Sequence, residues 1–247
     1  MISTALLALL PLVGAKTLSV DFSTYDSSNM TVSEFLASKG LMINTYDVDT
    51  GGDPYTHTYE EANVGISGGY LTLKVTGGTK SGSTVPSACI QTNDSNILHG
   101  TFKTTAIASD VAGVCHGFYT YESDSQESDI EILTSHLYSG NDAVNPGLQL
   151  TNQAINGNSS DNTRKAIAYP SDPTSGEHEY KLQWSSGLTE FFFDGSMVAS
   201  IDTNVPTAPS AFLWNSWSGG NPNWTEGPPT EDAILRISKI ELDYETS

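Results

Sequence analysis

Three carboxylates occupy alternate positions of one short segment, residues 127–133, whose sequence is ESDIEIL. In a β-strand, successive side chains point to opposite faces, so Glu127, Asp129 and Glu131 share one face. The serine and isoleucine side chains between them take the other face, and the isoleucines mark it as the side that packs into a core. We therefore expect three acids in a row on the side away from the core.

Carboxylates arranged in this way suit acid–base chemistry on a sugar. Asp129 lies about 6.6 Å along the strand from each glutamate, at about 3.3 Å per residue, and like charges so close raise at least one pKa. Glycosidic cleavage needs one ionised carboxylate at the anomeric carbon and one protonated carboxyl at the leaving oxygen. In a retaining reaction these groups are about 5–5.5 Å apart, so the side chains of Glu127 and Glu131 would have to lean together. A solvated acidic strand and a cation site are the alternatives.

The elements that position this segment are predicted to be short strands broken by Gly, Asn, Asp, Ser and Pro. Asp194-Gly195 is typical of a tight hairpin turn. The one plausible helix begins at a capping box, Thr31 to Glu34, and ends near Gly40. Many short strands with almost no helix favour an all-β, antiparallel two-sheet sandwich of the jelly-roll type. The predicted strands are 70–75, 100–105, 114–121, 128–133, 180–184, 190–193 and 197–201.

The last strand, 234–244, contains an irregularity. Leu235 and Ile237 have one parity, whereas Ile240, Leu242 and Tyr244 have the other. A regular strand cannot bury both sets on one face. We therefore predict a β-bulge or bend near residues 238–239.

The bulk composition bounds the function class. The 247-residue chain has a formal net charge of −19, which repels nucleic acid and anionic membranes but not a neutral polysaccharide. The first 15 residues combine an apolar run with small residues before a cleavage site, which is typical of a secretory signal peptide. We expect residues 16–247 to form a single catalytic domain, secreted, soluble and monomeric.

The two cysteines, Cys89 and Cys115, would form one disulfide in an oxidising compartment, and two buried free thiols are the alternative. Four Asn-x-Ser/Thr sequons support a secreted glycoprotein. They start at Asn29, Asn93, Asn158 and Asn223.

The acidic motif resembles the catalytic strand of glycoside hydrolase family 16, which contains laminarinases, lichenases and xyloglucan transglycosylases, here in a secreted fungal form. Further segments resemble the family in the same order along the chain. These are His178-Glu-Tyr180 with Trp184, Phe191-Phe-Phe-Asp-Gly195, Trp214-Asn-Ser-Trp217-Ser-Gly-Gly220 with Trp224, and Ile240-Glu-Leu-Asp-Tyr244.

This resemblance implies a jelly-roll sandwich with a substrate cleft on its concave sheet and a double-displacement reaction. By position in the motif, Glu127 resembles the nucleophile, Glu131 the general acid/base, and Asp129 the residue that tunes the nucleophile. The regular Glu-x-Asp-x-Glu spacing occurs in the lichenases and in the plant and fungal transglycosylases, whereas many β-1,3-glucanases have an extra residue. No cofactor is expected. A structural calcium ion would fit the family, although no ligands for it can be assigned.

Sugar-contacting residues are predicted mainly from aromatic character and from the resemblance. Indole rings stack on sugar faces, and alternation places Trp214 and Trp217 on opposite faces, so we assign Trp217 to the cleft and Trp214 to the core. Tyr119 and Tyr121 fit either place. Trp224, Tyr121, Asn215, Gln149 and His178 complete the predicted substrate-binding set. The histidines lack the spacing of a zinc site.

The sequence predicts a retaining endo-β-glucanase that acts on β-1,3- or mixed β-1,3-1,4-glucans. Two other readings stay open. One is a cell-wall glucan transglycosylase that uses the same residues, and the other is a non-catalytic lectin-like module on the same sandwich.

Overall fold

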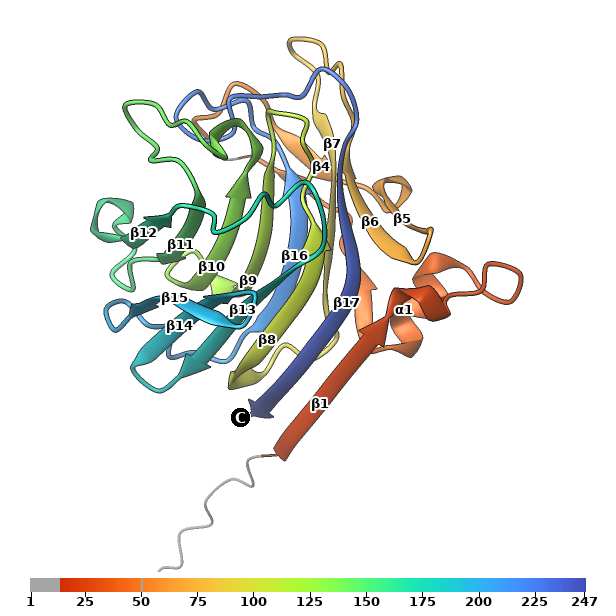
Figure 1. Cartoon of the computed structure of the whole chain (residues 1–247), viewed down its shortest axis with the longest axis vertical. Coiled ribbons are helices and arrows are strands. Elements are labelled where there is room, and N and C mark those ends of the chain that lie inside the picture. The colour runs from red at the N-terminus through yellow and green to blue at the C-terminus, as the bar shows by residue number, and fades with distance from the viewer. Residues whose placement is uncertain (1–13, 50) are drawn as a thin grey trace, which may run out of the picture.

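Two large β-sheets pack face to face in the computed structural model, which describes residues 14–49 and 51–247 (Figure 1). The sheet that carries the acidic segment is here called the cleft sheet, with strand order β12-β11-β10-β9-β16-β7-β4-β3 and β2 beside β7. The other is called the outer sheet, with order β15-β14-β13-β8-β17-β6-β5 and β1 beside β17. Neighbouring strands are antiparallel, except that β4 runs parallel to β7. The expected all-β jelly-roll sandwich is confirmed.

The cleft sheet consists of β2 (Leu41–Ile43), β3 (Asp47–Val48), β4 (His57–Tyr59), β7 (Val85–Thr92), β9 (Cys115–Ser123), β10 (Gln126–Leu133), β11 (Leu148–Asn152), β12 (Thr163–Ile167) and β16 (Ala211–Trp217). The outer sheet consists of β1 (Gly14–Asp21), β5 (Val64–Ser67), β6 (Tyr70–Val75), β8 (Ile97–Ile107), β13 (His178–Ser185), β14 (Leu188–Phe193), β15 (Ser196–Ile201) and β17 (Ala233–Thr246). The helical elements are α1 (Val32–Ser38) and the short 3₁₀ turns η1 (Phe22–Thr24), η2 (Glu61–Asn63), η3 (Thr134–His136) and η4 (Ser159–Asp161).

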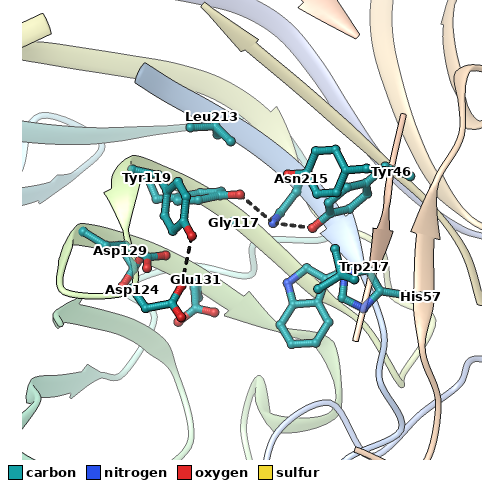
Figure 2. A pocket seen from close by; sticks show the side chains of 14 residues that line it. Tyr46, His57, Gly117, Tyr119, Asp124, Asp129, Glu131, Leu213, Asn215 and Trp217 are labelled. Carbon is teal, nitrogen blue, oxygen red and sulfur yellow. Dashed lines mark hydrogen bonds between the residues drawn. The ribbon is translucent and has the colours of Figure 1, made fainter. Parts of the chain in front are cut away.

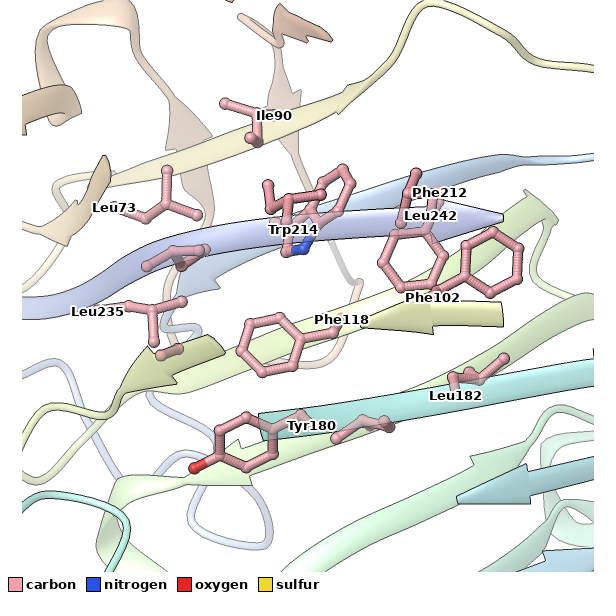
Figure 3. Close-up of a cluster of buried hydrophobic side chains, with 14 of the residues drawn as sticks. Leu73, Ile90, Phe102, Phe118, Tyr180, Leu182, Phe212, Trp214, Leu235 and Leu242 are labelled. Atoms are coloured by element: carbon pink, nitrogen blue, oxygen red, sulfur yellow. The ribbon is translucent and has the colours of Figure 1, made fainter. Parts of the chain in front are cut away.

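Alternation along the strands builds the core between the sheets (Figure 3). On β10, Ile130 and Ile132 are buried there, while the three acids at the alternate positions point away. Trp214 of β16 is fully buried and donates its indole N–H to Thr104 Oγ1 at 2.8 Å. Burial of a large apolar side chain contributes roughly 1.5–3 kcal/mol, so the core fixes the register of β10 and with it the face on which the acids lie.

Local sequence signals produced the expected structures. Thr31 caps α1 through a capping box with Glu34, and Gly40 follows the helix with φ 79°. Asp194 and Gly195 form the turn between β14 and β15, both with positive φ. The register of β17 against β8 shifts between Ile237 and Lys239, so the predicted bulge is confirmed.

The expected disulfide is wrong, because both cysteines are free and buried. Strand β16 lies between the two, with Cys89 of β7 opposite Asn215 and Cys115 of β9 opposite Trp217. Two strand spacings of about 4.8 Å and an offset of two residues place the Cα atoms roughly 12 Å apart. A disulfide requires less than about 7 Å, so the alternative of two buried thiols is the correct one.

The predicted signal peptide lies outside the described residues up to position 13. Strand β1 begins at Gly14, so the predicted cleavage point after Ala15 falls at the start of this strand, where it pairs with β17. In residues 14–49 and 51–247, no helix is long and apolar enough to cross a membrane.

Candidate active site

The acidic segment forms an unbroken part of β10. It pairs with β9 from Glu127 opposite Tyr121 to Leu133 opposite Cys115, and the register shifts only before Glu127. The alternation inferred from the sequence therefore holds. All three acids line one cleft on the outward face of the cleft sheet, with a volume of about 260 Å³ (Figure 2).

Asp129 is the most enclosed of the three acids, with 2% of its surface exposed. Gln153, just past the end of β11, donates from Nε2 to Asp129 Oδ2 at 2.9 Å. Asn162 in turn donates to Gln153 Oε1 at 2.6 Å, which fixes the orientation of that amide. The Asp129 carboxylate is thus held in place by Gln153, which is itself held by Asn162, and it lies between the two glutamates.

Burial raises the pKa of all three acids. It is the largest cause for Glu127, whose pKa is raised further by the charge and hydrogen bond of Asp129. The pKa of Asp129 rises to about 8 through burial and the Glu131 charge, although hydrogen bonds from Glu127 and Gln153 oppose this rise. A cluster of this kind retains protons at higher pH than isolated acids do, so the predicted increase in at least one pKa is confirmed.

Glu131 has different neighbours from the other two acids. Burial raises its pKa, whereas a hydrogen bond from Cys115, the Arg164 charge and a hydrogen bond from Trp224 act in the opposite direction. The Arg164 guanidinium lies 4.4 Å from the centre of the Trp224 ring, which is a cation–π contact. Arg164 also lowers the pKa of Asp129, so it is the cation that acts on this part of the cluster.

Aromatic side chains form one arm of the cleft (Figure 2). Asn215 of β16 lies at its centre and donates from Nδ2 to the hydroxyls of Tyr59 and Tyr119, each at 3.1 Å. Trp217 stacks on the ring of His57 at 4.9 Å between centroids. The remaining aromatic members are Tyr46 and Tyr121.

His57 is buried in this arm, and burial lowers its pKa to about 4. The ring is therefore neutral near pH 7. Among the described residues neither of its ring nitrogens has a hydrogen-bond partner. The neutral imidazole therefore supports the Trp217 ring on which it stacks.

A second hollow of about 330 Å³ adjoins the first beyond Glu127. Asp124 and Glu127 line both hollows, and Gln153, Gly157 and Asn162 help to line the second. Its lining is polar, unlike the aromatic arm. Glu127 therefore stands at the border of two hollows of different character.

Comparison with known proteins identifies the family. The sequence profile of glycosyl hydrolases family 16 matches residues 51–244, which is most of the chain. The chain belongs to this family. That match lies within the domain expected at 16–247, and the family resemblance carried by the acidic motif is confirmed.

Individual relatives of this family-16 chain are distant. It is 24% identical over 143 residues to a β-glucanase of Paenibacillus macerans, and this covers 55% of the chain and 56% of the relative. The chain thus spans about half the length of the curated relatives it matches.

Solved structures share its fold over nearly the whole chain. A prokaryotic β-1,3-1,4-glucanase (lichenase) from a mouse hindgut metagenome has a TM-score of 0.68 at 19% identity, covering 92% of this chain and 98% of that one. The laminarinase catalytic domain of Thermotoga maritima has a TM-score of 0.69 at 14% identity, covering 93% and 96%.

Several predicted contact residues of this family-16 domain lie in the cleft. Trp217, Asn215 and Tyr121 line it, and the opposite placements of Trp214 and Trp217 are confirmed. Tyr119 and Tyr121, which the sequence left undecided, both belong to the cleft. Trp224 is not in the aromatic arm, but it packs near Cys115 and acts to lower the pKa of Glu131.

Two predicted substrate contacts need correction. Gln149 lies opposite Glu131 but is 1% exposed, and its Nε2 donates to the backbone carbonyls of Asn145 and Gly147 at 2.9 Å each. It therefore holds a loop and has no free amide proton for a sugar. His178 lies in the outer sheet, where it stacks on Phe193 and hydrogen-bonds Asp194. Neither residue lines the cleft.

Other site residues were missed by the sequence analysis. Strand β4 has three residues, too few for a periodic signal, so His57 and Tyr59 could not be placed. Gln153 follows β11 directly, but nothing in its local sequence indicates that its amide reaches Asp129. Cys115 was assigned to a disulfide, although its thiol in fact donates a hydrogen bond to Glu131 Oε1.

Within the part of the chain that the structure describes, no group of three or more His, Cys, Asp or Glu side chains is placed to hold a metal ion.

Proposed function

We propose that this family-16 chain is a retaining endo-β-glucanase that cleaves β-1,3- or mixed β-1,3-1,4-glucans by double displacement. One observation carries the proposal: three carboxyls with raised pKa stand on one regular strand at the floor of an aromatic cleft. The solved structures of similar fold include a β-1,3-1,4-glucanase and a laminarinase, which supports this substrate class.

In the first half of the reaction, the ionised Glu127 carboxylate attacks the anomeric carbon and the glycosidic bond breaks. Glu131 donates its proton to the departing oxygen, so that the leaving sugar departs as a neutral alcohol. In the second half, Glu131 takes a proton from water, and that oxygen displaces Glu127 from the sugar. The configuration at the anomeric carbon is retained because it is inverted twice.

Asp129 controls the protonation state of Glu127. The two share a hydrogen bond, so a proton held between them lets Glu127 attack without two full negative charges side by side. When Glu127 forms its ester with the sugar, its charge disappears and Asp129 can ionise. Gln153 stabilises that ionised form through its 2.9 Å hydrogen bond.

The shape of the site supports cleavage within a chain rather than at its end. Glu127 stands at the border of the aromatic cleft and the polar hollow beyond it. A polymer threaded across β10 can occupy both spaces. Apolar sugar faces would stack on Trp217, and Asn215 would hold the arm in shape through its two tyrosine partners.

Product analysis tests the proposal. Purified protein is incubated with laminarin, lichenan, barley β-glucan and xyloglucan oligosaccharides, and products are resolved by mass spectrometry, with Glu127→Gln as control. We expect shorter oligomers from laminarin or the mixed-linkage glucans and none from the variant. Products longer than the starting oligomer would show that the protein is a transglycosylase and not a hydrolase. If the protein binds these glucans but cleaves none of them, it is a lectin-like binding module and not an enzyme.

Secretion is part of the same proposal. The N-terminal pattern supports it, and the asparagines of all four sequons are exposed. The free cysteines give it no support. Expression in a eukaryotic host tests it: the secreted protein should begin at Lys16 and lose mass on treatment with an N-glycosidase. Retention in the cell with an uncleaved N-terminus would contradict it.

A further inference from the structure

The thiol of Cys115 donates a hydrogen bond to Glu131 Oε1 at 3.2 Å. Cys115 opens β9, where its partners across the strands are Leu133 of β10 and Trp217 of β16. It is fully buried. The acid proposed to protonate the leaving oxygen is therefore in direct contact with a thiol that no other part of the mechanism uses.

The geometry that permits this contact depends on Gly117. Residues directly opposite on antiparallel strands point to the same face, and the residue opposite Glu131 on β9 is Gly117. A glycine puts no side chain between Glu131 and the next same-facing residue along β9, which is Cys115. The Glu131 carboxyl thus reaches diagonally across the strand to the thiol.

The surroundings of Cys115 keep its thiol protonated, so that it can donate a hydrogen bond. Leu133, Val144, Trp217 and Trp224 pack around it. Burial, the largest cause, and the Glu131 charge raise the pKa of the thiol well above its ordinary value. The thiol therefore stays protonated throughout the working range of a glycosidase, and its hydrogen is directed at the carboxylate.

We propose that Cys115 is a positioning residue for the acid/base step, which orients the Glu131 carboxyl and sets how firmly it holds its proton. This rests on the proposed function. An S–H donor on Oε1 leaves Oε2 as the oxygen that carries the transferable proton. A thiol is a weak donor, so it stabilises the ionised carboxylate less than a hydroxyl would, and Glu131 keeps enough proton affinity to act as an acid.

Other charged groups that face Glu131 also influence its pKa. Asp129 lies beside it on β10 with Glu127 beyond, and Arg164 of β12 is the cation that acts on it. Trp224, which is uncharged, also acts to lower the pKa of Glu131. These groups stay in place when Cys115 is changed, so a shift in the basic limb of the pH profile reports the thiol contact.

The test compares Cys115→Ala and Cys115→Ser with wild type in kcat/KM against pH on the glucan. Loss of the donor should move the basic limb of Cys115→Ala to higher pH, by about half a unit to one unit. The stronger hydroxyl donor should move that of Cys115→Ser to lower pH. Cys89→Ala, which removes the other buried thiol, should leave both limbs in place. An unmoved limb in Cys115→Ala, or an equal shift in Cys89→Ala, would overturn the proposal.

A second measurement does not depend on turnover. The S–H stretching band in the infrared spectrum falls in frequency when the thiol donates to a carboxylate. The band lost in Cys115→Ala should lie below the band lost in Cys89→Ala, and Glu131→Gln should raise it. Coincident bands that do not respond to Glu131→Gln would refute the contact. If wild type cleaves no glucan, the proposed function fails, and this band alone decides whether the contact exists.

An activated aryl glycoside separates positioning from general damage. Its leaving group departs without acid help, so kcat/KM for Cys115→Ala should match wild type on this substrate and fall on the glucan. An equal loss on both substrates would mean a structural defect and would contradict a role at the acid step.

Discussion

The side-chain oxygen of Asn215 lies 2.6 Å from the position that a β-carbon on Gly117 would occupy. The two residues are paired across β16 and β9. The aromatic arm of the cleft is therefore built around an amide that fits only because its neighbour lacks a side chain. Asn215 in turn bonds both Tyr59 and Tyr119, so this one close approach sets the shape of the arm.

The substitution Gly117→Ala should displace the Asn215 amide and break those hydrogen bonds. We expect kcat/KM on glucan to fall about tenfold and the protein to lose about 1–3 kcal/mol of stability, the usual cost of overpacking. Steady-state kinetics and thermal unfolding measure both. Gly176→Ala is the control, since a β-carbon there meets nothing within 4 Å. Wild-type kinetics in Gly117→Ala would mean that Asn215 does not shape the arm.

The hydrogen bond from Gln153 to Asp129 should govern the acid limb of the pH profile. A donor to the ionised carboxylate lowers its pKa, so Gln153→Ala should raise the pKa of Asp129. The Glu127–Asp129 pair then keeps its second proton to higher pH, and the acid limb of kcat/KM moves to higher pH. Gln183→Ala is a matched control, because Gln183 bonds Glu190 in the outer sheet. A shift of the acid limb to lower pH would contradict this role.

The buried acids should cost stability at neutral pH. The pKa of Asp129 is about 8 in the folded protein against an ordinary 3.8, so the folded state binds more protons than the unfolded state between these values. Stability therefore falls as pH rises from about 4 to about 8.

Asp129→Asn removes the contribution of Asp129 to that dependence, while Glu127 and Glu131 keep theirs. It should raise Tm by several degrees at pH 8, at about 2–4 °C per kcal/mol for a chain of this size, and the gain should vanish near pH 4. Differential scanning calorimetry at both pH values checks this. The exposed control Asp202→Asn should show no such trend. A gain of equal size at pH 4 and pH 8 would show that charge burial is not its cause.

The cysteines should behave as two inert thiols. Without a reducing agent, a thiol reagent should label neither residue in the folded protein and both after unfolding, because Cys89 and Cys115 are fully buried and burial raises the pKa of each. Intact mass spectrometry counts the labels. If the unfolded, unreduced protein takes up no label, the two cysteines form a disulfide, in contradiction to the structure.

The sequence predicted those features that depend on near neighbours in the chain. The alternation of 127–133 placed the acids on one face, the parity change before Ile240 located the bulge, and Thr31 with Glu34 marked the helix start. Each of these signals lies within a few residues, and the core enforces it. The strand order of the sheets is not local, and the errors at the cysteines and at His178 arose there. Gln149 was placed on the correct strand, but its amide hydrogen-bonds the preceding loop and not the cleft.

The prediction of a disulfide was wrong because nothing in the sequence indicates that β16 separates β7 from β9. His178 was assigned to the cleft from a family-like segment, but the strand it begins lies in the outer sheet. His57 was missed because its stacking partner in the cleft, Trp217, lies far away in the sequence and meets it only in the folded chain. Such contacts between distant strands cannot be inferred from one sequence.

The central claim is that Glu127 forms a covalent bond to the sugar. The most direct measurement uses a 2-deoxy-2-fluoro glucoside with a dinitrophenyl leaving group, which slows the second step and traps the glycosyl ester. Peptide mapping of the inactivated protein by mass spectrometry should place one label on Glu127, and none should form in Glu127→Gln. A label on Glu131, or active protein that is never labelled, would contradict the assignment of Glu127 as the nucleophile.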